Sequence, residues 1–227
     1  MKSMVSALHL QPTQTLRLAN HYATLSFRGC EVRMPLRIMI DIDGVLNTLD
    51  TTVIEVYNED SGDSLSPQDI TEYHIEKFVK PEYRENFKNY FLDKRVWQRI
   101  NVIDGCQDVI KKLWNEGYNI IFVTKTECEN LVKKRNWLNR TFPFIGANNM
   151  KTILFSAPCK QLIRADIAID DGLFNLLGDR TYWSICFDKP YNQTDKPIPM
   201  FTRAYNWQNI YDSIKMIETL LKENENE

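Results

Sequence analysis

The strongest indication of the fold is the run Leu36-Arg37-Ile38-Met39-Ile40-Asp41-Ile42-Asp43-Gly44-Val45. It begins as an apolar β-strand and ends in a glycine turn, and Asp41 and Asp43 stand where the strand stops. Two neighbouring carboxylates repel each other unless a cation lies between them or one of them keeps its proton. The stretch therefore predicts an α/β protein with a metal ion, or with divided acid and base roles, at this strand end.

A second pair of carboxylates, Asp170-Asp171, comes directly after the apolar run Ile167-Ala168-Ile169. Taken alone, the run Asp-Asp-Gly is equally typical of an ordinary turn. In an open parallel sheet, however, the loops at the carboxyl ends of the strands gather into one crevice, so we expect the two pairs to meet. Four carboxylates at the ends of two strands suit a hard ion such as Mg²⁺ far better than zinc.

Past residue 35, short apolar runs alternate with amphipathic stretches, which predicts a three-layer, Rossmann-like α/β core of parallel strands joined by helices. The expected strands are 36–42, 119–124, 166–169 and 182–187, with a shorter run at 152–155. The expected helices are 104–116, 127–139 and a last helix capped by Asn206, preceded by a loop containing Pro190, Pro197 and Pro199.

The core is interrupted by a segment without a parallel-strand signal, and we interpret residues 53–100 as a small helical cap inserted after the first strand. A helix is expected over 81–92, and its aromatic residues should pack into a small core of the cap. This division leaves residues 35–52 and 101–222 for the core and 223–227 for a polar tail.

Residues 1–34 form an extension of different composition, in which Glu31 is the only acidic residue. Its basic and hydroxyl side chains resemble a mitochondrial targeting segment. Because Met34 stands directly before the first core strand, a dispensable leader is an equally open interpretation, and a structured appendage is a third.

Charge and cysteine content exclude several classes of protein. The formal net charge is -2, from 28 basic and 30 acidic side chains, so no global field attracts nucleic acid or a membrane. The five cysteines are scattered singly, which argues against a disulfide framework or a zinc site and favours a reducing, cytoplasmic compartment. No apolar run approaches the ~20 residues that span a bilayer. The oligomeric state stays open, with a homodimer as one possibility.

Four motifs in order carry a family resemblance: Asp41-x-Asp43-Gly44-Val45, Thr124 at a strand end, Lys160, and Asp170-Asp171 ten residues further on. This order resembles the signature of the haloacid dehalogenase (HAD) phosphohydrolases. Within that superfamily the chain is most similar to the 5′(3′)-deoxyribonucleotidases, a resemblance that covers roughly residues 36–220.

The resemblance implies that Asp41 attacks phosphorus and forms an aspartyl-phosphate, which water then hydrolyses. Asp43 would protonate the leaving oxygen and later take a proton from the attacking water. Mg²⁺ would be coordinated by Asp41, by the backbone carbonyl of Asp43, and by the pair Asp170 and Asp171, with Asp171 the better candidate for direct contact.

The resemblance also assigns a phosphate site to Thr124 and Lys160. Lys151 is a rival for Lys160 but lacks the ten-residue spacing to the second aspartate pair. The nucleotidases that this chain resembles usually place Ser after the motif Thr, whereas Lys125 stands here. Lys125 either adds charge to the phosphate site or points away from it.

The substrate pocket is the least defined part of the prediction. Leu49 stands where the similar nucleotidases carry a Phe near the base, and Tyr73 and Trp97 are candidates for stacking on the base. The leading interpretation is a Mg²⁺-dependent phosphatase of nucleoside monophosphates, favouring deoxyribonucleotides and not binding nucleic acid stably. The alternatives are a HAD phosphatase for another small ester or a nucleic-acid 3′-phosphate, and a non-catalytic nucleotide-binding regulatory protein.

Overall fold

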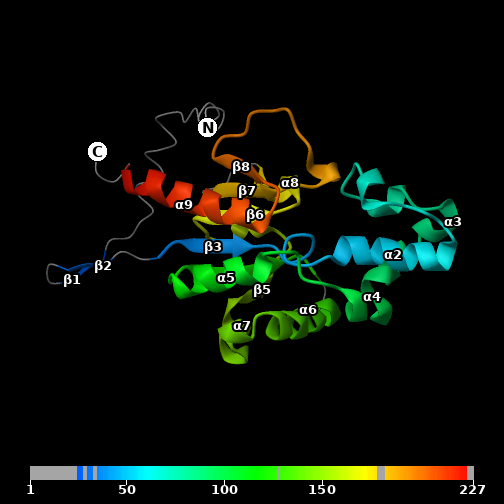
Figure 1. The fold of residues 1–227 in the computed structure, drawn as a ribbon, viewed down its shortest axis with the longest axis horizontal. Coiled ribbons are helices and arrows are strands. Elements are labelled where there is room, and N and C mark those ends of the chain that lie inside the picture. The colour runs from blue at the N-terminus through cyan, green and yellow to red at the C-terminus, as the bar shows by residue number, and fades with distance from the viewer. Residues whose placement is uncertain (1–24, 28–29, 33–34, 127, 178–181, 224–227) are drawn as a thin grey trace.

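A six-stranded sheet, all of its strands parallel, forms the centre of the computed structural model, with the strand order β5-β4-β3-β6-β7-β8 (Figure 1). The structure describes residues 25–27, 30–32, 35–126, 128–177 and 182–223. Its strands are β1 (Leu25–Phe27), β2 (Cys30–Val32), β3 (Arg37–Ile40), β4 (Asn119–Thr124), β5 (Leu154–Ser156), β6 (Ile167–Asp170), β7 (Trp183–Phe187) and β8 (Phe201–Ala204).

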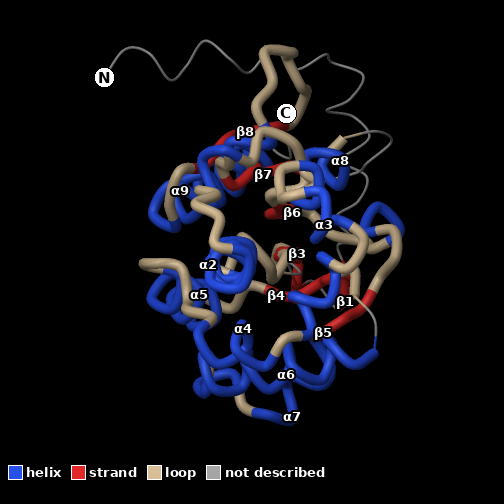
Figure 2. The backbone as a smooth tube through the Cα atoms, turned by 90° about the vertical axis from the view of Figure 1, so that its right-hand side faces the viewer, coloured by secondary structure: helices blue, strands red, loops and turns tan. Residues whose placement is uncertain are grey.

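The helices lie on both sides of the strands (Figure 2). They are α2 (Leu49–Ser61), α3 (Pro81–Arg84), α4 (Lys94–Arg99), α5 (Cys106–Asn115), α6 (Cys128–Thr141), α7 (Ala147–Ile153), α8 (Leu173–Leu176) and α9 (Trp207–Glu223). Short 3₁₀ turns occur at Pro67–Asp69, Ile75–Lys77, Phe87–Leu92, Pro143–Ile145, Lys160–Leu162 and Pro190–Asn192. None of the helices described is long and apolar enough to cross a membrane.

The two faces of the sheet explain why the central strands are apolar throughout. In β3, Ile38 and Ile40 enter the larger core with α5 and α9, whereas Met39 enters a second core with α8 on the other face. Side chains alternate between faces along a strand, and a parallel strand covered on both sides buries every residue. The predicted α/β fold with helices flanking a parallel sheet is thus confirmed.

Two local predictions were wrong. The segment after the prolines holds an edge strand, β8, where a loop was expected, because Arg203 and its neighbours pair with β7 although their sequence carries little apolar periodicity. The helix expected over 81–92 is divided into α3 and a 3₁₀ turn. The cap of the last helix is confirmed, since the Asn206 side chain accepts a hydrogen bond from the Asn209 N–H at 2.9 Å.

The segment between β3 and α5 forms a helical body at the end of the sheet toward which β3 runs (Figure 1). Helix α2 begins four residues before the predicted start of the cap, so it connects the core to this body without a break. The ring of Tyr57, fully buried, is the centre of the body, with Tyr83 and Phe87 at 5.4 and 5.8 Å in edge-on contact. We refer to residues 53–100 as the cap.

The predicted extension, residues 1–34, and the end of the polar tail lie largely outside the described residues. Within the extension, β1 and β2 pair as an antiparallel hairpin. Helix α9 continues to Glu223, one residue into the predicted tail.

Candidate active site

The turn that follows β3 brings the two aspartate pairs together. Asp41 donates its backbone N–H to the carbonyl of Ile169 at 2.9 Å, which ties the end of β3 to the end of β6. Gly44 has φ of +71°, and a Cβ at this position would lie 2.2 Å from Oδ2 of Asp171. Only glycine permits both the backbone conformation and the close approach of the second pair.

Three buried carboxylates, those of Asp41, Asp170 and Asp171, form one cluster, in which one oxygen of each lies within 4.8 Å of the others. The side chain of Asp43 lies beside this cluster and faces α6. Its Oδ2 accepts a hydrogen bond from the Lys134 ammonium, and its Oδ1 accepts one from Asn47 at 3.2 Å. The structure therefore separates the carboxylates into a cluster of three and a single neighbour.

Lys160 is the cation of the cluster. Its Nζ lies 2.7 Å from Oδ1 of Asp41 and 2.7 Å from Oδ2 of Asp170, and its side chain is only 3% exposed. Burial by itself lowers the pKa of this ammonium, but the charges of Asp41 and Asp170 outweigh burial and raise it. Lys160 is therefore held charged, whereas its rival Lys151 is exposed on α7.

The cluster holds more negative charge than Lys160 neutralises. Burial, with the charges of Asp170 and Asp43, raises the pKa of Asp41 from 3.8 to about 7, against the opposing effect of Lys160. Burial and the charges of Asp41 and Asp170 likewise raise the pKa of Asp171 well above its ordinary value. Oxygen ligands crowded in this way fit a hard divalent cation, whose charge would let all three carboxylates ionise.

The second aspartate pair is braced by its own loop and by the loop after β7. Asp170 accepts hydrogen bonds from the Gly172 N–H at 2.8 Å and from the Asn175 amide at 3.1 Å. Asp171 is held at its side chain by the Tyr191 hydroxyl and at its backbone carbonyl by the Asn192 amide, at 2.8 Å. Sequence reasoning missed both residues of the second loop, because a Pro-Tyr-Asn turn carries no motif of its own.

Lys134 lies within the candidate site, although the sequence analysis did not identify it. Its ammonium donates to Oδ2 of Asp43 and to the Thr124 hydroxyl, the latter at 2.6 Å. Lys134 is buried on α6, on the same face as Trp137 and Leu138, three and four residues further along. A lysine within an apolar helix face is expensive to bury without a partner, and this pattern was the available signal.

Lys125, which was predicted to contribute to phosphate binding, has an exposed side chain. Thr124 itself is buried at the end of β4, and its hydroxyl faces Lys134. The positive charge beside the Thr124 hydroxyl therefore comes from helix α6.

The three predicted pocket residues occupy different surroundings. Leu49 is buried in the core at the start of α2. Trp97 packs partly buried against the hydrophobic core and donates its indole N–H to the Phe91 carbonyl at 2.8 Å. Tyr73 is 49% exposed, and burial together with the charges of Asp171 and Asp41 raises the pKa of its hydroxyl. Tyr73 therefore lies close enough to the carboxylate cluster for the charges of the cluster to act on its hydroxyl.

A parallel sheet of this topology, with helical residues inserted after the first core strand and carboxylates at the strand ends, has the architecture of the haloacid dehalogenase class. Solved structures with this fold include a haloacid dehalogenase-like protein from Agrobacterium tumefaciens str. C58, with a TM-score of 0.56 and 13% identity, covering 82% of this chain and all of that one. Another is a HAD family hydrolase from Deinococcus radiodurans R1 with bound phosphate and sodium, with a TM-score of 0.51 and 13% identity, covering 81% of this chain and 96% of that one. At these identities the likeness shows the fold alone.

Sequence relatives narrow the class. The chain belongs to the family described as 5′ nucleotidase, deoxy (pyrimidine), cytosolic type C, whose model matches residues 34–220. A 5′(3′)-deoxyribonucleotidase from Clostridium acetobutylicum is 32% identical, covering 80% of this chain and 94% of the relative. A second, from Bacillus subtilis (strain 168), is 33% identical, covering 76% of this chain and 95% of the relative. The predicted resemblance is confirmed, and the protein is a nucleotidase of the phosphomonoester hydrolase type.

Proposed function

We propose that the protein hydrolyses deoxyribonucleoside monophosphates in a Mg²⁺-dependent reaction that passes through an aspartyl-phosphate on Asp41. The observation that carries this proposal is the bridge of Lys160 between Asp41 and Asp170, 2.7 Å from each, inside a cluster of three buried carboxylates. The names of the two bacterial relatives support the substrate class.

Phosphate would enter between three groups of this chain: the Thr124 hydroxyl and the ammonium groups of Lys134 and Lys160. Asp41, Asp170, Asp171 and the backbone carbonyl of Asp43 would hold Mg²⁺. When bound, the cation offsets the repulsion between a carboxylate nucleophile and an anionic phosphate. The donor set supports this assignment, because all of its groups are oxygens and because burial, together with neighbouring carboxylates, raises the pKa of Asp41 and of Asp171.

In the first step, Asp41 is the nucleophile. Its Oδ1 is held by the Ile42 N–H at 2.7 Å and by Lys160, so Oδ2 is the oxygen that attacks. A bond forms between Oδ2 and phosphorus while the bond from phosphorus to the ester oxygen breaks. Asp43 transfers its proton to that oxygen, and the nucleoside leaves as an alcohol.

The second step reverses the role of Asp43. Its carboxylate takes a proton from water, the water oxygen attacks phosphorus, and the Asp41 carboxylate is released with inorganic phosphate. In this structure the Lys134 ammonium donates a hydrogen bond to the Asp43 carboxylate. An arriving phosphate would compete for the Lys134 ammonium, which would free the Asp43 carboxyl to carry the proton.

A phosphate-release screen tests the proposal. Deoxyribonucleotides, ribonucleotides, sugar phosphates and a DNA 3′-phosphate are compared with Mg²⁺ and with EDTA, alongside the Asp41→Asn variant. We expect deoxyribonucleoside monophosphates to give the highest kcat/KM, with Mg²⁺ required. A tenfold advantage for a sugar phosphate or a 3′-phosphate would favour the alternative HAD phosphatases. Nucleotide binding without any release of phosphate would favour a regulatory protein.

A reducing compartment such as the cytoplasm is consistent with the cysteines, since Cys106, Cys128, Cys159 and Cys186 are free thiols among the described residues. The predicted homodimer stays a prediction.

A further inference from the structure

Tyr191 connects the cap to the carboxylate cluster. Its hydroxyl donates a hydrogen bond to Oδ2 of Asp171, and its ring meets the ring of Tyr73 edge-on, with centroids 5.8 Å apart. Tyr73 comes from the cap, and Tyr191 comes from the turn Pro190–Asn192 on the core. A single side chain therefore touches both the cap and the carboxylate cluster.

The ring of Tyr73 packs against two aromatic rings of the core. Besides Tyr191, its ring contacts Phe174 of α8 edge-on at 4.7 Å, the shortest separation of ring centroids among the described aromatic pairs. The Phe174 ring in turn lies against Gly172, where an added Cβ would meet it at 3.2 Å. The cap thus rests on the loop that carries Asp170 and Asp171, and edge-on aromatic pairs of this kind are worth ~0.5–1.5 kcal/mol each.

The turn that carries Tyr191 is itself rigidly held, so the hydroxyl has a defined direction. Asn192 is 1% exposed and donates to the carbonyls of Asp171 and Phe187, both at 2.8 Å. Arg203 of β8 donates to Oδ1 of Asn192 at 2.7 Å and to its backbone carbonyl at 2.9 Å. The unexpected edge strand therefore supports the loop, and on the cap side the ring of Tyr191 meets the ring of Tyr73.

We propose that Tyr191 is a positioning residue that couples the seating of the cap to the geometry of Asp171 as a metal ligand. The inference rests on the metal role proposed for Asp171. With Tyr73 seated, the Tyr191 ring is confined and its hydroxyl fixes the rotamer of the Asp171 carboxylate. With Tyr73 withdrawn, the ring gains freedom and that restraint weakens. By reciprocity, a cation that orders Asp171 stabilises the seated cap.

The test is a double-mutant cycle on Mg²⁺ affinity, measured by isothermal titration calorimetry on the full chain without nucleotide. Tyr191→Phe keeps the ring but removes the hydroxyl, and we expect it to weaken Mg²⁺ binding ~10-fold, the usual scale for a group that orients a metal ligand. Tyr73→Ala should weaken binding ~5-fold in the wild-type background, at the lower end of allosteric couplings. In the Tyr191→Phe background, Tyr73→Ala should not weaken Mg²⁺ binding further, because the hydroxyl that orients Asp171 is already absent.

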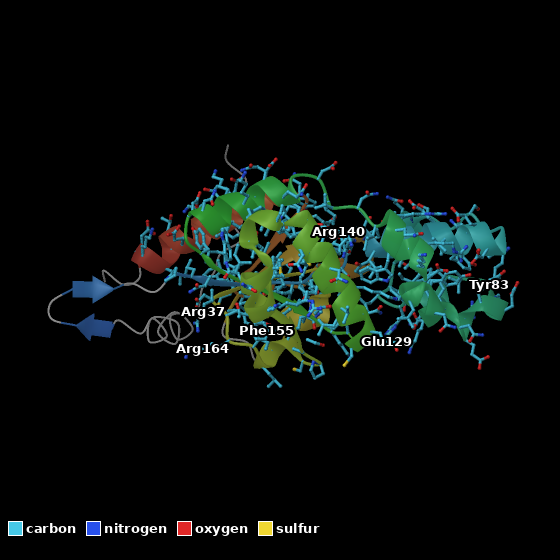
Figure 3. The ribbon with its side chains drawn as sticks, turned by 90° about the horizontal axis from the view of Figure 1, so that it is seen from below. Arg37, Tyr83, Glu129, Arg140, Phe155 and Arg164 are labelled. Atoms are coloured by element: carbon cyan, nitrogen blue, oxygen red, sulfur yellow. The ribbon has the colours of Figure 1, made fainter. Side chains whose placement is uncertain are left out.

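The matched control is Tyr83→Ala, which removes another cap tyrosine. Tyr83 packs on Tyr57 and lies at the outer end of the cap (Figure 3). It should lower Tm without changing the affinity for Mg²⁺. A second readout is amide hydrogen exchange over residues 71–78, which Mg²⁺ should slow in the wild type and less in Tyr191→Phe.

Additive losses in the cycle, or a wild-type Mg²⁺ affinity in Tyr191→Phe, would overturn the coupling while leaving the proposed function intact. If the wild-type protein binds no Mg²⁺ in the same titration, the metal role of Asp171 fails, and the inference fails with it. Tm measured for every variant separates these outcomes from unfolding.

Discussion

The carboxylate cluster and the cap are built on opposite physical principles. In the cluster, a few buried charges face one another, and Lys160 contacts two carboxylates while its side chain is 3% exposed. In the cap, aromatic rings pack around Tyr57, and ion pairs such as Arg95 with Asp60 lie at the surface with 40% and 34% exposure. Buried charges are sensitive to a single atom, whereas distributed packing and exposed pairs tolerate change. Substitutions in the cluster should therefore have large effects, and substitutions in the cap should have small ones.

The largest effect is expected for Asp41→Asn. The amide is nearly isosteric with the carboxylate but cannot attack phosphorus, so turnover should fall by at least ~10⁴-fold, as for other lost nucleophiles. Acid-quenched phosphoenzyme should carry its label on Asp41 in the wild type. A label on any other residue would contradict the mechanism. Since Asp41 is crowded by other carboxylates, the metal-free variant should be no less stable than the wild type.

The next comparison is between Lys134, a buried lysine that the structure adds to the proposed phosphate site, and Lys125, an exposed lysine that the sequence predicted there. Lys134→Met should lower kcat/KM ~10²–10³-fold, the scale for removing one group that stabilises charge in the transition state. Lys125→Met should stay within about threefold, because its side chain is exposed. Steady-state kinetics on one deoxyribonucleotide compares the pair. Equal losses for both lysines would restore Lys125 to the phosphate site.

Alanine substitutions at two glycines with positive φ, one beside the cluster and one in the cap, compare the two regions most directly. At Gly44 a Cβ would lie 2.2 Å from Oδ2 of Asp171, whereas at Gly62, which ends α2, nothing lies within 4 Å. Both alanine variants carry backbone strain of ~1–2 kcal/mol. Only Gly44→Ala should also displace Asp171 and weaken Mg²⁺ binding ~10–100-fold. Calorimetric titration and Tm of the two variants measure both effects, and equal Mg²⁺ affinities would refute the proposed crowding.

The sequence predicted the cluster better than the cap because the motif residues stand beside apolar runs, which locate the ends of strands. Asp41, Thr124, Lys160 and Asp170 each follow or precede a short apolar run at a distance set by the sheet, and parallel topology then brings them together. Lys134 was missed because it belongs to a helix face, where a lysine is usually solvated. The apolar face of α6 indicates that Lys134 is buried, but no local pattern identifies Asp43 as its partner.

The limits of the cap were predicted from the absence of a strand signal, and that absence does not indicate which cap residues contact the core. Tyr73 meets Tyr191 across more than a hundred residues of sequence, and no periodicity encodes that meeting. The helix expected over 81–92 is divided into α3 and the 3₁₀ turn Phe87–Leu92, and Asn86 lies between them with φ of -101° and ψ of 4°. Contacts between separate elements are the part of a fold that a single sequence leaves undetermined.

A smaller effect is expected for stability against pH in the metal-free protein. The pKa of Asp41 is raised from 3.8 to about 7, and that of Asp171 is raised as well. The folded state therefore binds more protons than the unfolded state between pH ~4 and ~7, so the free energy of unfolding falls as pH rises through this window. Tm should decrease from pH 5 to pH 8, and saturating Mg²⁺ should remove the decrease. A flat Tm in EDTA would contradict the raised pKa values.

The smallest effect belongs to the cap. Trp97 is anchored through its indole N–H to the Phe91 carbonyl at 2.8 Å, and the Lys133 ammonium lies 5.9 Å from the centre of its ring. If the ring forms part of the base pocket, Trp97→Ala should raise KM more than it lowers kcat, by a factor of ~5–10, at the lower end of base–aromatic stacking energies. Tyr83→Ala is the control, because its ring packs on Tyr57, and it should leave KM unchanged. A nucleotide and p-nitrophenyl phosphate, which has no base, are assayed side by side. An equal change in KM for both substrates would remove Trp97 from the base pocket and leave it a packing residue of the cap.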